Sequence, residues 1–313
     1  MTLTELRYIV AVAREKHFGR AAEKCFVSQP TLSVAIKKLE DELGVALFER
    51  AANEIRVTDV GNRVIEQAQR VLEGASAIKH IAAAGKDELT GPLRFGAIYT
   101  VGPYVTPQLI PLLMKRAPQM PLLIQENYTA KLGEMLKIGD IDLILLSEPF
   151  VEPGIVTHAV YDEPFRVVMP ASHEWAKKPR IAAIDLCSET LLLLSSGNCF
   201  RDQVMQTCAG AKRALNAGLQ QSLEGSSLET IRQMVASGVG LTVLPSTAAE
   251  CRTADVKLTA TKPFSAPEPT RRIALAWRKS FPRARAVQVV REALLACKLP
   301  GVTLLPQARP IAN

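Results

Sequence analysis

Apolar positions in the first part of the chain recur every three or four residues, the spacing of amphipathic helices. This spacing predicts one helix over residues 3–14 and a second, shorter helix over Gly19–Lys24. Ser28 is a good N-cap residue and Gly44 stands where a C-cap is wanted, so a third helix is expected between them. Three helices with a tight turn between the second and the third describe a helix-turn-helix.

The third predicted helix carries polar side chains on the faces that its apolar positions leave open. Gln and Thr near its start could hydrogen-bond to base edges in DNA, and its lysines could reach phosphates. Residues 48–58 then predict a two-stranded wing, whose arginines could touch the DNA backbone or the minor groove. A plain three-helix bundle with a solvated polar face is the alternative. The candidate DNA-binding residues are Gln29, Thr31, Ser33, Lys37, Arg50 and Arg56.

A longer helical pattern covers residues 58–84. Its apolar residues repeat at alternating steps of four and three, a heptad-like seam that suits pairing with a second copy of the chain. A helix packed on its own domain is the alternative. The polar stretch Gly85–Pro92 contains Gly and Pro and predicts a linker. The seam consists of Val60, Val64, Ala68, Val71, Ala75, Ile78 and Ala82.

After the linker, short apolar runs alternate with amphipathic stretches. This alternation occurs twice and predicts two α/β lobes built on parallel sheet. The fold class expected is therefore α/β with an N-terminal winged helix-turn-helix over residues 1–58, a linker helix and hinge over 59–90, and a two-lobed regulatory domain over 91–313. The predicted strands cover residues 93–100, 121–127, 141–147, 165–170, 191–194, 219–225 and 271–278, with another ending at Pro245.

Two lobes joined by crossovers leave a cleft between them. Ligands of open α/β sheets bind at the carboxyl ends of strands, beside helix N-termini. Thr100, Thr129 and Cys199 all fall at junctions of this kind, and Thr129 is placed to N-cap the helix that follows it. These three residues could therefore converge on one pocket.

The stretch SSGNCFRDQVMQTC carries two cysteines nine residues apart, Cys199 and Cys208. Cys199 is expected at the start of a short helix, close to the cation of Arg201, and both features stabilise a thiolate. Nine residues of ideal helix rise ~13.5 Å, whereas a disulfide needs Cα atoms within ~4.4–6.8 Å. The pair could therefore bond only if the segment unwinds, which describes a redox switch. Two ordinary buried cysteines are the alternative.

Composition adds limits to this picture. The chain has 313 residues and a net charge of +7, but residues 1–90 carry 13 basic and 13 acidic side chains, so charge is no argument for DNA binding. No apolar run reaches the ~18 residues that span a membrane, and no signal peptide is evident, so a cytoplasmic location is expected. Six cysteines without a CxxC or a Cys/His cluster predict no disulfide framework, metal site or cofactor.

The stretch FGRAAEKCFVSQPTLSVAIKKLEDELGVALFER and the threonine of RVTDVG resemble the LysR-type transcriptional regulators, and the match runs through both lobes. Within that family, GNCFRDQVMQTC and SSLETIRQMVASG resemble the peroxide-sensing members. The resemblance implies a periplasmic-binding-protein-like regulatory domain. It also implies that Gln29, Pro30, Thr31, Ser33 and Arg50 match recognition-helix and wing positions that face DNA.

The same resemblance implies roles for the candidate pocket. Cys199 matches the peroxidatic cysteine, and Cys208 matches the resolving cysteine that forms an intramolecular disulfide with it. Thr100 and Thr129 match threonines that hold hydrogen peroxide or an ordered water near the thiol. Asp202 matches a polar residue of that pocket.

One residue departs from the family pattern. Asn198 stands where the peroxide sensors commonly have histidine, and an asparagine can hydrogen-bond but cannot take up a proton near neutral pH. Arg201 and the helix terminus would then have to stabilise the thiolate more fully, together with an arginine from another strand such as Arg271. A sensor tuned to a different peroxide level is the alternative.

The function expected from the resemblance is that of an activator, not an enzyme. Hydrogen peroxide would oxidise Cys199, the disulfide with Cys208 would rearrange the oligomer, and oxidative-stress genes would be activated. The implied partners are promoter DNA, further copies of the chain in a dimer of dimers, RNA polymerase, and a thioredoxin or glutaredoxin system as reductant. A LysR-type regulator with a small-molecule inducer in the cleft, a thiol peroxidase and a DNA binder without sensing are the alternatives.

Overall fold

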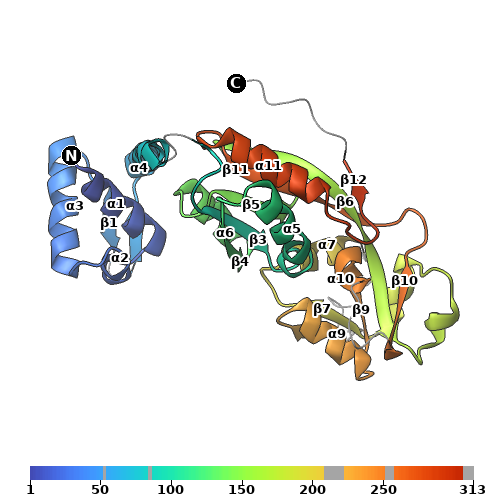
Figure 1. The fold of residues 1–313 in the computed structure, drawn as a ribbon. Coiled ribbons are helices and arrows are strands. Elements are labelled where there is room, and N and C mark those ends of the chain that lie inside the picture. The colour runs from blue at the N-terminus through green and yellow to red at the C-terminus, as the bar shows by residue number, and fades with distance from the viewer. Residues whose placement is uncertain (52–53, 84–86, 208–221, 251–256, 306–313) are drawn as a thin grey trace. The chain divides into compact units, whose positions relative to one another are not determined.

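The computed structural model describes the chain except for residues 52–53, 84–86, 208–221, 251–256 and 306–313 (Figure 1). The chain divides into two compact units, the first comprising residues 1–85 and 137–139 and the second residues 86–136 and 140–313. Over the residues that the structure describes, no helix is both long enough and apolar enough to cross a membrane.

The first unit begins with three helices, α1 (Leu3–Glu15), α2 (Phe18–Lys24) and α3 (Gln29–Leu43). Ser28 is the N-cap of α3, and its hydroxyl accepts a hydrogen bond from the Thr31 amide. Gly44 ends α3 in the left-handed conformation at φ +68°, which glycine adopts without a steric cost. Both caps were predicted, and both are confirmed. Ile9 and Leu32 are fully buried between the helices.

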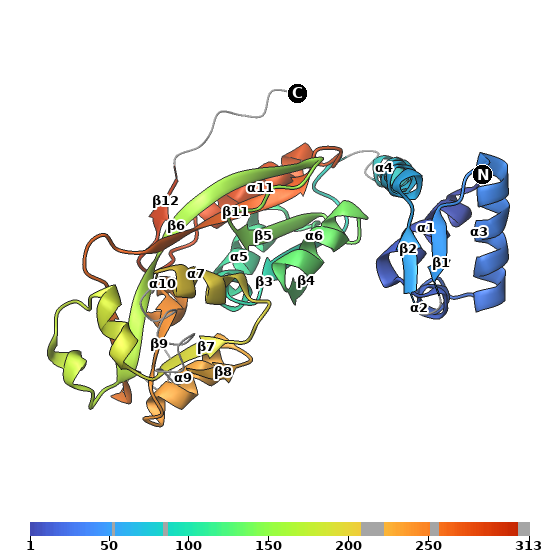
Figure 2. The same ribbon diagram turned by 180° about the vertical axis from the view of Figure 1, so that it is seen from behind.

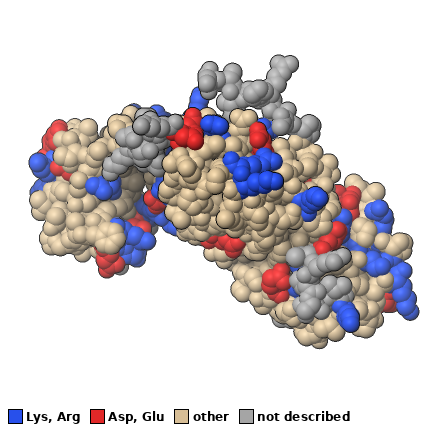
Figure 3. Space-filling model, viewed as in Figure 1, with Lys and Arg blue, Asp and Glu red and all other residues tan. Residues whose placement is uncertain are grey.

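An antiparallel hairpin follows the helices, and it is the predicted wing. Its strands are β1 (Phe48–Ala51) and β2 (Glu54–Val57). The predicted long helix is α4 (Asp59–Ala83). On the face shown in Figure 3, basic and acidic side chains are interspersed over this unit, in line with the equal numbers of acidic and basic residues over 1–90.

The apolar seam of α4 is divided between two environments. Ala68 is buried and Val64 packs on the core of the three helices. Val60, Val71 and Ile78 remain exposed. Part of the seam is thus packed within its own unit, which is the alternative that the spacing left open. Pairing of the remaining positions with a second copy stays a prediction.

The second unit is built on one continuous sheet. Its strands lie in the order β4-β3-β5-β11-β6-β9-β7-β8, and β10 and β12 also pair with β6. Strand β4 is at the end of this order and lies at the edge beside β3 (Figure 2). One half of the sheet contains β3 (Leu93–Ile98), β4 (Leu122–Asn127), β5 (Leu143–Ser147) and β11 (Thr270–Arg278), with helices α5 (Gly102–Arg116), α6 (Thr129–Lys137) and α11 (Ala284–Leu295).

The other half contains shorter elements. These are the 3₁₀ helices η1 (Glu174–Lys177) and η2 (Ala183–Ser188), the strands β7 (Leu191–Leu194), β8 (Ser222–Gly225), β9 (Leu241–Pro245) and β10 (Thr259–Pro263), and the helices α7 (Cys199–Thr207), α9 (Leu228–Ala236) and α10 (Ser246–Ala249). A two-residue strand, β12 (Thr303–Leu304), follows α11.

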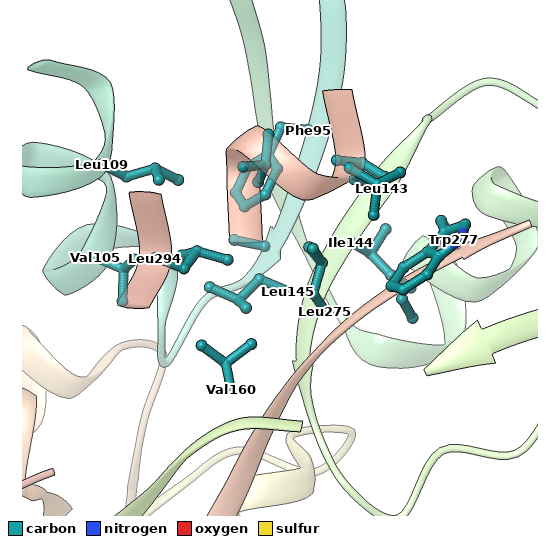
Figure 4. Close-up of a cluster of buried hydrophobic side chains, with 14 of the residues drawn as sticks. Phe95, Val105, Leu109, Leu143, Ile144, Leu145, Val160, Leu275, Trp277 and Leu294 are labelled. Atoms are coloured by element: carbon teal, nitrogen blue, oxygen red, sulfur yellow. The ribbon is translucent and has the colours of Figure 1, made fainter. Parts of the chain in front are cut away.

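Strand β6 (Ile155–Pro170) joins the two halves. Its residues Val160 and Tyr161 lie in the core of the first lobe (Figure 4 labels Val160 there, beside Leu145 and Leu275). Its residues Phe165 and Val167 lie in the core of the second lobe. The short strand predicted over residues 165–170 is only the last part of β6.

The prediction of parallel sheet is correct for part of the sheet. Strands β3, β4 and β5 are parallel, as are β7, β8 and β9. Strand β11 is antiparallel to β5 and β6, and β6 is antiparallel to β9. Strand β6 spans both halves of the sheet, and β11 follows β10 without a helix between them. Parallel neighbours need a crossover connection, usually a helix, which these strands lack.

Candidate functional site

Three strand-to-helix junctions of the second unit meet at one pocket. Strand β3 leads to α5 through Thr100, β4 leads to α6 through Thr129, and β7 leads to α7 through Cys199. The expected convergence of these three residues is observed. The lining residues of the pocket are Ile98, Tyr99, Thr100, Asn127, Tyr128, Thr129, Gly197, Asn198 and Cys199.

The pocket has the size of a very small ligand. It offers a volume of about 10 Å³ to the centre of a water-sized sphere. A volume of roughly 10–15 Å³ on this measure holds one water molecule. The space beside Thr129 and Cys199 is therefore about that of one water molecule.

The Thr129 hydroxyl and the Cys199 thiol are in direct contact, with Thr129 Oγ1 donating to Cys199 Sγ over 3.6 Å. Thr129 was expected to cap α6 but is its first residue. Cys199 is the first residue of α7, so the sulfur lies at the helix N-terminus, where main-chain dipoles favour negative charge. A hydroxyl donor and a helix N-terminus thus both direct partial positive charge at the sulfur.

Thr100 is held by a buried arginine. Arg271 donates from Nη1 to Thr100 Oγ1 over 2.8 Å and from Nη2 to the Thr100 carbonyl oxygen over 2.9 Å. Its Nε donates to Glu163 Oε2 over 2.8 Å, and both charged side chains are fully buried. Because Thr100 accepts from a cation, its own hydroxyl hydrogen is free to donate to a molecule in the pocket.

Asn198 holds the turn that precedes α7. Its Nδ2 donates to the carbonyl oxygen of Ser195 over 3.1 Å, and the residue is buried. The side chain therefore has a partner within its own turn, and its effect on the thiol stays a prediction. The thiolate-stabilising role suggested for Arg271 reaches Cys199 only indirectly, since its guanidinium donates to Thr100 and Glu163.

Arg201 and Asp202 lie outside the lining of this pocket. Arg201 Nη1 donates to the Leu194 carbonyl oxygen over 2.7 Å and to Glu224 Oε1 over 2.6 Å. Asp202 is exposed. The roles expected of both side chains at the thiol stay predictions, and the structure places neither beside the Thr129–Cys199 pair.

Gln203 is a residue of the site that the sequence did not single out. Its Nε2 donates to Ser147 Oγ over 2.9 Å and to the Glu148 carbonyl oxygen over 3.3 Å, while its Oε1 is buried without a partner among the described residues. These bonds fasten α7 to the end of β5 in the other lobe. Tyr99 and Tyr128 were missed as well, although each directly precedes a candidate threonine.

The remaining cysteines divide into two groups. Cys208 and Cys251 lie outside the described residues, so the pairing of Cys208 with Cys199 stays a prediction. Burial raises the pKa of Cys297 to about 11 and also raises the pKa of Cys25. Cys25, Cys187 and Cys297 are packed in or against apolar cores, as expected for structural cysteines. Among the residues that the structure describes, no group of three His, Cys, Asp or Glu side chains could hold a metal ion.

The predicted DNA-binding residues belong to α3 and to the hairpin of the first unit. Gln29, Pro30, Thr31 and Lys37 are exposed on α3, opposite its buried Leu32. Ser33 is half-buried on α3, and Arg56 is exposed on β2. Arg50 belongs to β1. A helix that presents polar side chains next to a two-stranded wing has the geometry of a winged DNA-binding module.

Family models match both units. The model described as "Bacterial regulatory helix-turn-helix protein, lysR family" matches residues 3–62. The model described as "LysR substrate binding domain" matches residues 86–297. The chain belongs to the LysR family. The family resemblance predicted from the helix-turn-helix stretch is thereby confirmed.

Relatives of this LysR-family chain are peroxide regulators by name. A "Hydrogen peroxide-inducible genes activator" of Dickeya chrysanthemi is 40% identical over 285 residues, covering 90% of this chain and 91% of the relative. The "DNA-binding transcriptional dual regulator OxyR" of Escherichia coli K12 is 37% identical over 299 residues, covering 95% of both chains. Within the LysR family the chain is thus most like OxyR.

Solved structures agree with this assignment. A full-length Pseudomonas aeruginosa OxyR with a cysteine-to-aspartate substitution is 50% identical, with a TM-score of 0.74, and the match covers 97% of this chain and 98% of that chain. A Corynebacterium glutamicum OxyR mutant described as H2O2-bound is 33% identical, with a TM-score of 0.63, and the match covers 94% of this chain and 92% of that chain. The expected architecture of a helix-turn-helix joined to a LysR regulatory domain is confirmed.

Proposed function

We propose that this LysR-family regulator senses hydrogen peroxide through oxidation of Cys199. The observation that carries the proposal is the contact of 3.6 Å between Thr129 Oγ1 and Cys199 Sγ inside a pocket of one-water size. The names of the relatives, which are hydrogen peroxide-inducible activators, support it.

The first step is a two-electron oxidation of sulfur. The Cys199 thiolate attacks one oxygen of hydrogen peroxide, an S–O bond forms and the O–O bond breaks. The second oxygen leaves as hydroxide and becomes water on taking up a proton. Sulfur is oxidised to sulfenic acid, and the peroxide is reduced. Thr100 can donate a hydrogen bond to the leaving oxygen, because its hydroxyl accepts from Arg271.

The second step closes a disulfide. The thiolate of Cys208 attacks the sulfenic sulfur, an S–S bond forms and the S–O bond breaks, releasing the oxygen as water. Helix α7 runs from Cys199 to Thr207, and a helix of this length holds its ends farther apart than the ~4.4–6.8 Å between Cα atoms that a disulfide needs. Disulfide formation then requires α7 to unwind and to give up the Gln203 bonds to Ser147 and Glu148.

Unwinding of α7 supplies the signal. Phe200 and Val204 of this helix are buried in the core of the second lobe, so its refolding changes that lobe and the way regulatory domains pair. In this proposal α3 reads promoter DNA, the active form is a dimer of dimers, RNA polymerase responds, and a thioredoxin or glutaredoxin system reduces the disulfide in the cytoplasm. Each chain reacts once per signal, which is signalling and not enzymatic turnover.

The deciding experiment is mass-mapping of every thiol before and after a brief pulse of hydrogen peroxide. We expect a Cys199–Cys208 disulfide in the native protein and a Cys199 sulfenic acid in the Cys208→Ser variant. The proposal fails if Cys199 and Cys208 remain unlinked and unmodified.

The rival functions give different results. A regulator with a small-molecule inducer would keep full induction in the Cys199→Ser variant. A thiol peroxidase would sustain peroxide turnover with thioredoxin after removal of residues 1–58. A DNA binder without sensing would give a footprint that does not change on oxidation.

A further inference from the structure

The outer part of the pocket around Cys199 is aromatic, whereas its inner part is polar. Thr100 and Asn198 are buried, at 3% and 7% exposure. Tyr99 and Tyr128 also line the pocket, but they are 41% and 40% exposed. Together with Gly197, these two tyrosines are the exposed residues of the lining.

The two rings are packed against each other. Their centroids are 5.3 Å apart and their planes lie at 77°, an edge-to-face pair. Such pairs are attractive beyond the area that they bury. Tyr99 comes from the β3–α5 junction and Tyr128 from the β4–α6 junction, so the contact closes the gap between two separate segments.

The third side of the opening is the turn before α7. Gly197 is exposed, lines the pocket and has φ +93°. A Cβ at this position would lie 3.9 Å from a ring carbon of Tyr128. One carbon atom added to Gly197 would thus touch the Tyr128 ring, so the ring lies close to the turn that precedes Cys199.

We propose that Tyr99 and Tyr128 form a size filter that admits hydrogen peroxide to Cys199 and excludes organic hydroperoxides. The inference rests on the proposed peroxide sensing and adds the specificity of the site. The pocket volume of about 10 Å³ is near that of one water molecule, and hydrogen peroxide is larger than water by a single oxygen atom. An alkyl hydroperoxide carries a carbon group that fits only if the rings separate. Separation would break the edge-to-face pair.

The filter is tested by two alanine variants, Tyr99→Ala and Tyr128→Ala, in the full-length protein. The matched controls Tyr99→Phe and Tyr128→Phe keep the rings and remove only the hydroxyls. Rate constants for oxidation of Cys199 are measured with hydrogen peroxide and with tert-butyl hydroperoxide. We expect the ratio of the two rate constants to fall by about tenfold in the alanine variants, the size of a typical steric discrimination, and to hold in the phenylalanine controls.

A second readout separates the filter from the peroxide chemistry. Alkylation of Cys199 by iodoacetamide and by the bulkier N-ethylmaleimide reports access without any oxidation. The alanine variants should speed the maleimide reaction more than the iodoacetamide reaction. If hydrogen peroxide leaves native Cys199 unoxidised, the proposed function fails, while this alkylation ratio still decides the filter.

Three outcomes overturn the filter. The first is that both ratios are unchanged in both alanine variants. The second is that the phenylalanine controls change as much as the alanine variants, which would assign the effect to the hydroxyls. The third is a lower rate with tert-butyl hydroperoxide in the alanine variants, which would make the rings a binding platform. Should an alanine variant fail to fold, the leucine variant at the same position replaces it.

Discussion

Replacing Thr129 with valine removes one hydroxyl from the site and keeps the shape of the side chain. The hydroxyl donates to Cys199 Sγ over 3.6 Å. A hydrogen bond to a charged partner contributes about 1.5–3 kcal/mol. The long donor–acceptor distance and the partial exposure of Cys199 place this bond at the lower end of that range.

A loss of about 1.5 kcal/mol in the transition state corresponds to a rate about tenfold lower. The assay is the rate of Cys199 oxidation by hydrogen peroxide, followed by mass spectrometry in the Cys208→Ser background, where the reaction stops at the first step. Thr129→Ser keeps the hydroxyl, and its rate of Cys199 oxidation should stay within about threefold of the native rate. The small loss arises because serine lacks the methyl group and its hydroxyl can adopt further rotamers that point away from the sulfur.

Thr106→Val is the matched control. Thr106 also carries a hydroxyl in a helical turn, but it donates to the Gly102 carbonyl oxygen within α5. In the Thr106→Val variant, the rate of Cys199 oxidation should equal that of the native chain. A Thr129→Val variant that is folded, binds DNA when reduced and reacts at the native rate would refute the role of this hydrogen bond.

Three further predictions concern the surroundings of the site. Gln203→Ala should favour the disulfide over the dithiol by about 1 kcal/mol, a shift of the redox potential near 20 mV, because the Gln203 bonds exist only while α7 is folded. A thiol redox titration measures this shift. Substitution of the exposed Gln206 on the same helix should leave the potential unchanged. Arg271→Met should lower the free energy of unfolding in urea by about 3 kcal/mol, since it leaves the Glu163 carboxylate buried without its cation; a loss below 1 kcal/mol would contradict this. The pKa of Cys297, about 11, keeps this thiol protonated at pH 8, so its alkylation should rise with pH until the pH passes that value; rapid labelling at pH 8 would contradict the burial argument.

The sequence was sufficient for several features that depend on neighbouring residues, although the predicted cap at Thr129 is instead the first residue of α6. The caps at Ser28 and Gly44 were predictable because each acts within one helical turn. The start of α7 at Cys199 followed from the strand and turn before it. The convergence of the threonines with the cysteine followed from a general rule of α/β sheets, which places strand ends and helix starts together.

The rest depends on contacts between distant residues. Arg271 and Glu163 are 108 positions apart, so no local pattern indicates that they form a buried pair. Arg201 on α7 binds Glu224 on β8, a contact that its closeness in sequence to Cys199 does not indicate. Tyr99 carries no polar pattern that marks it as pocket lining, and its place follows only once β3 and β4 are adjacent.

Strand β6 has a consequence for cooperativity. It supplies Val160 and Tyr161 to one apolar core and Phe165 and Val167 to the other. Neither core can lose this strand without opening the other, so the two lobes are thermodynamically linked through their shared backbone. The regulatory unit should therefore unfold in a single transition, and any residue that stabilises one lobe also protects the other.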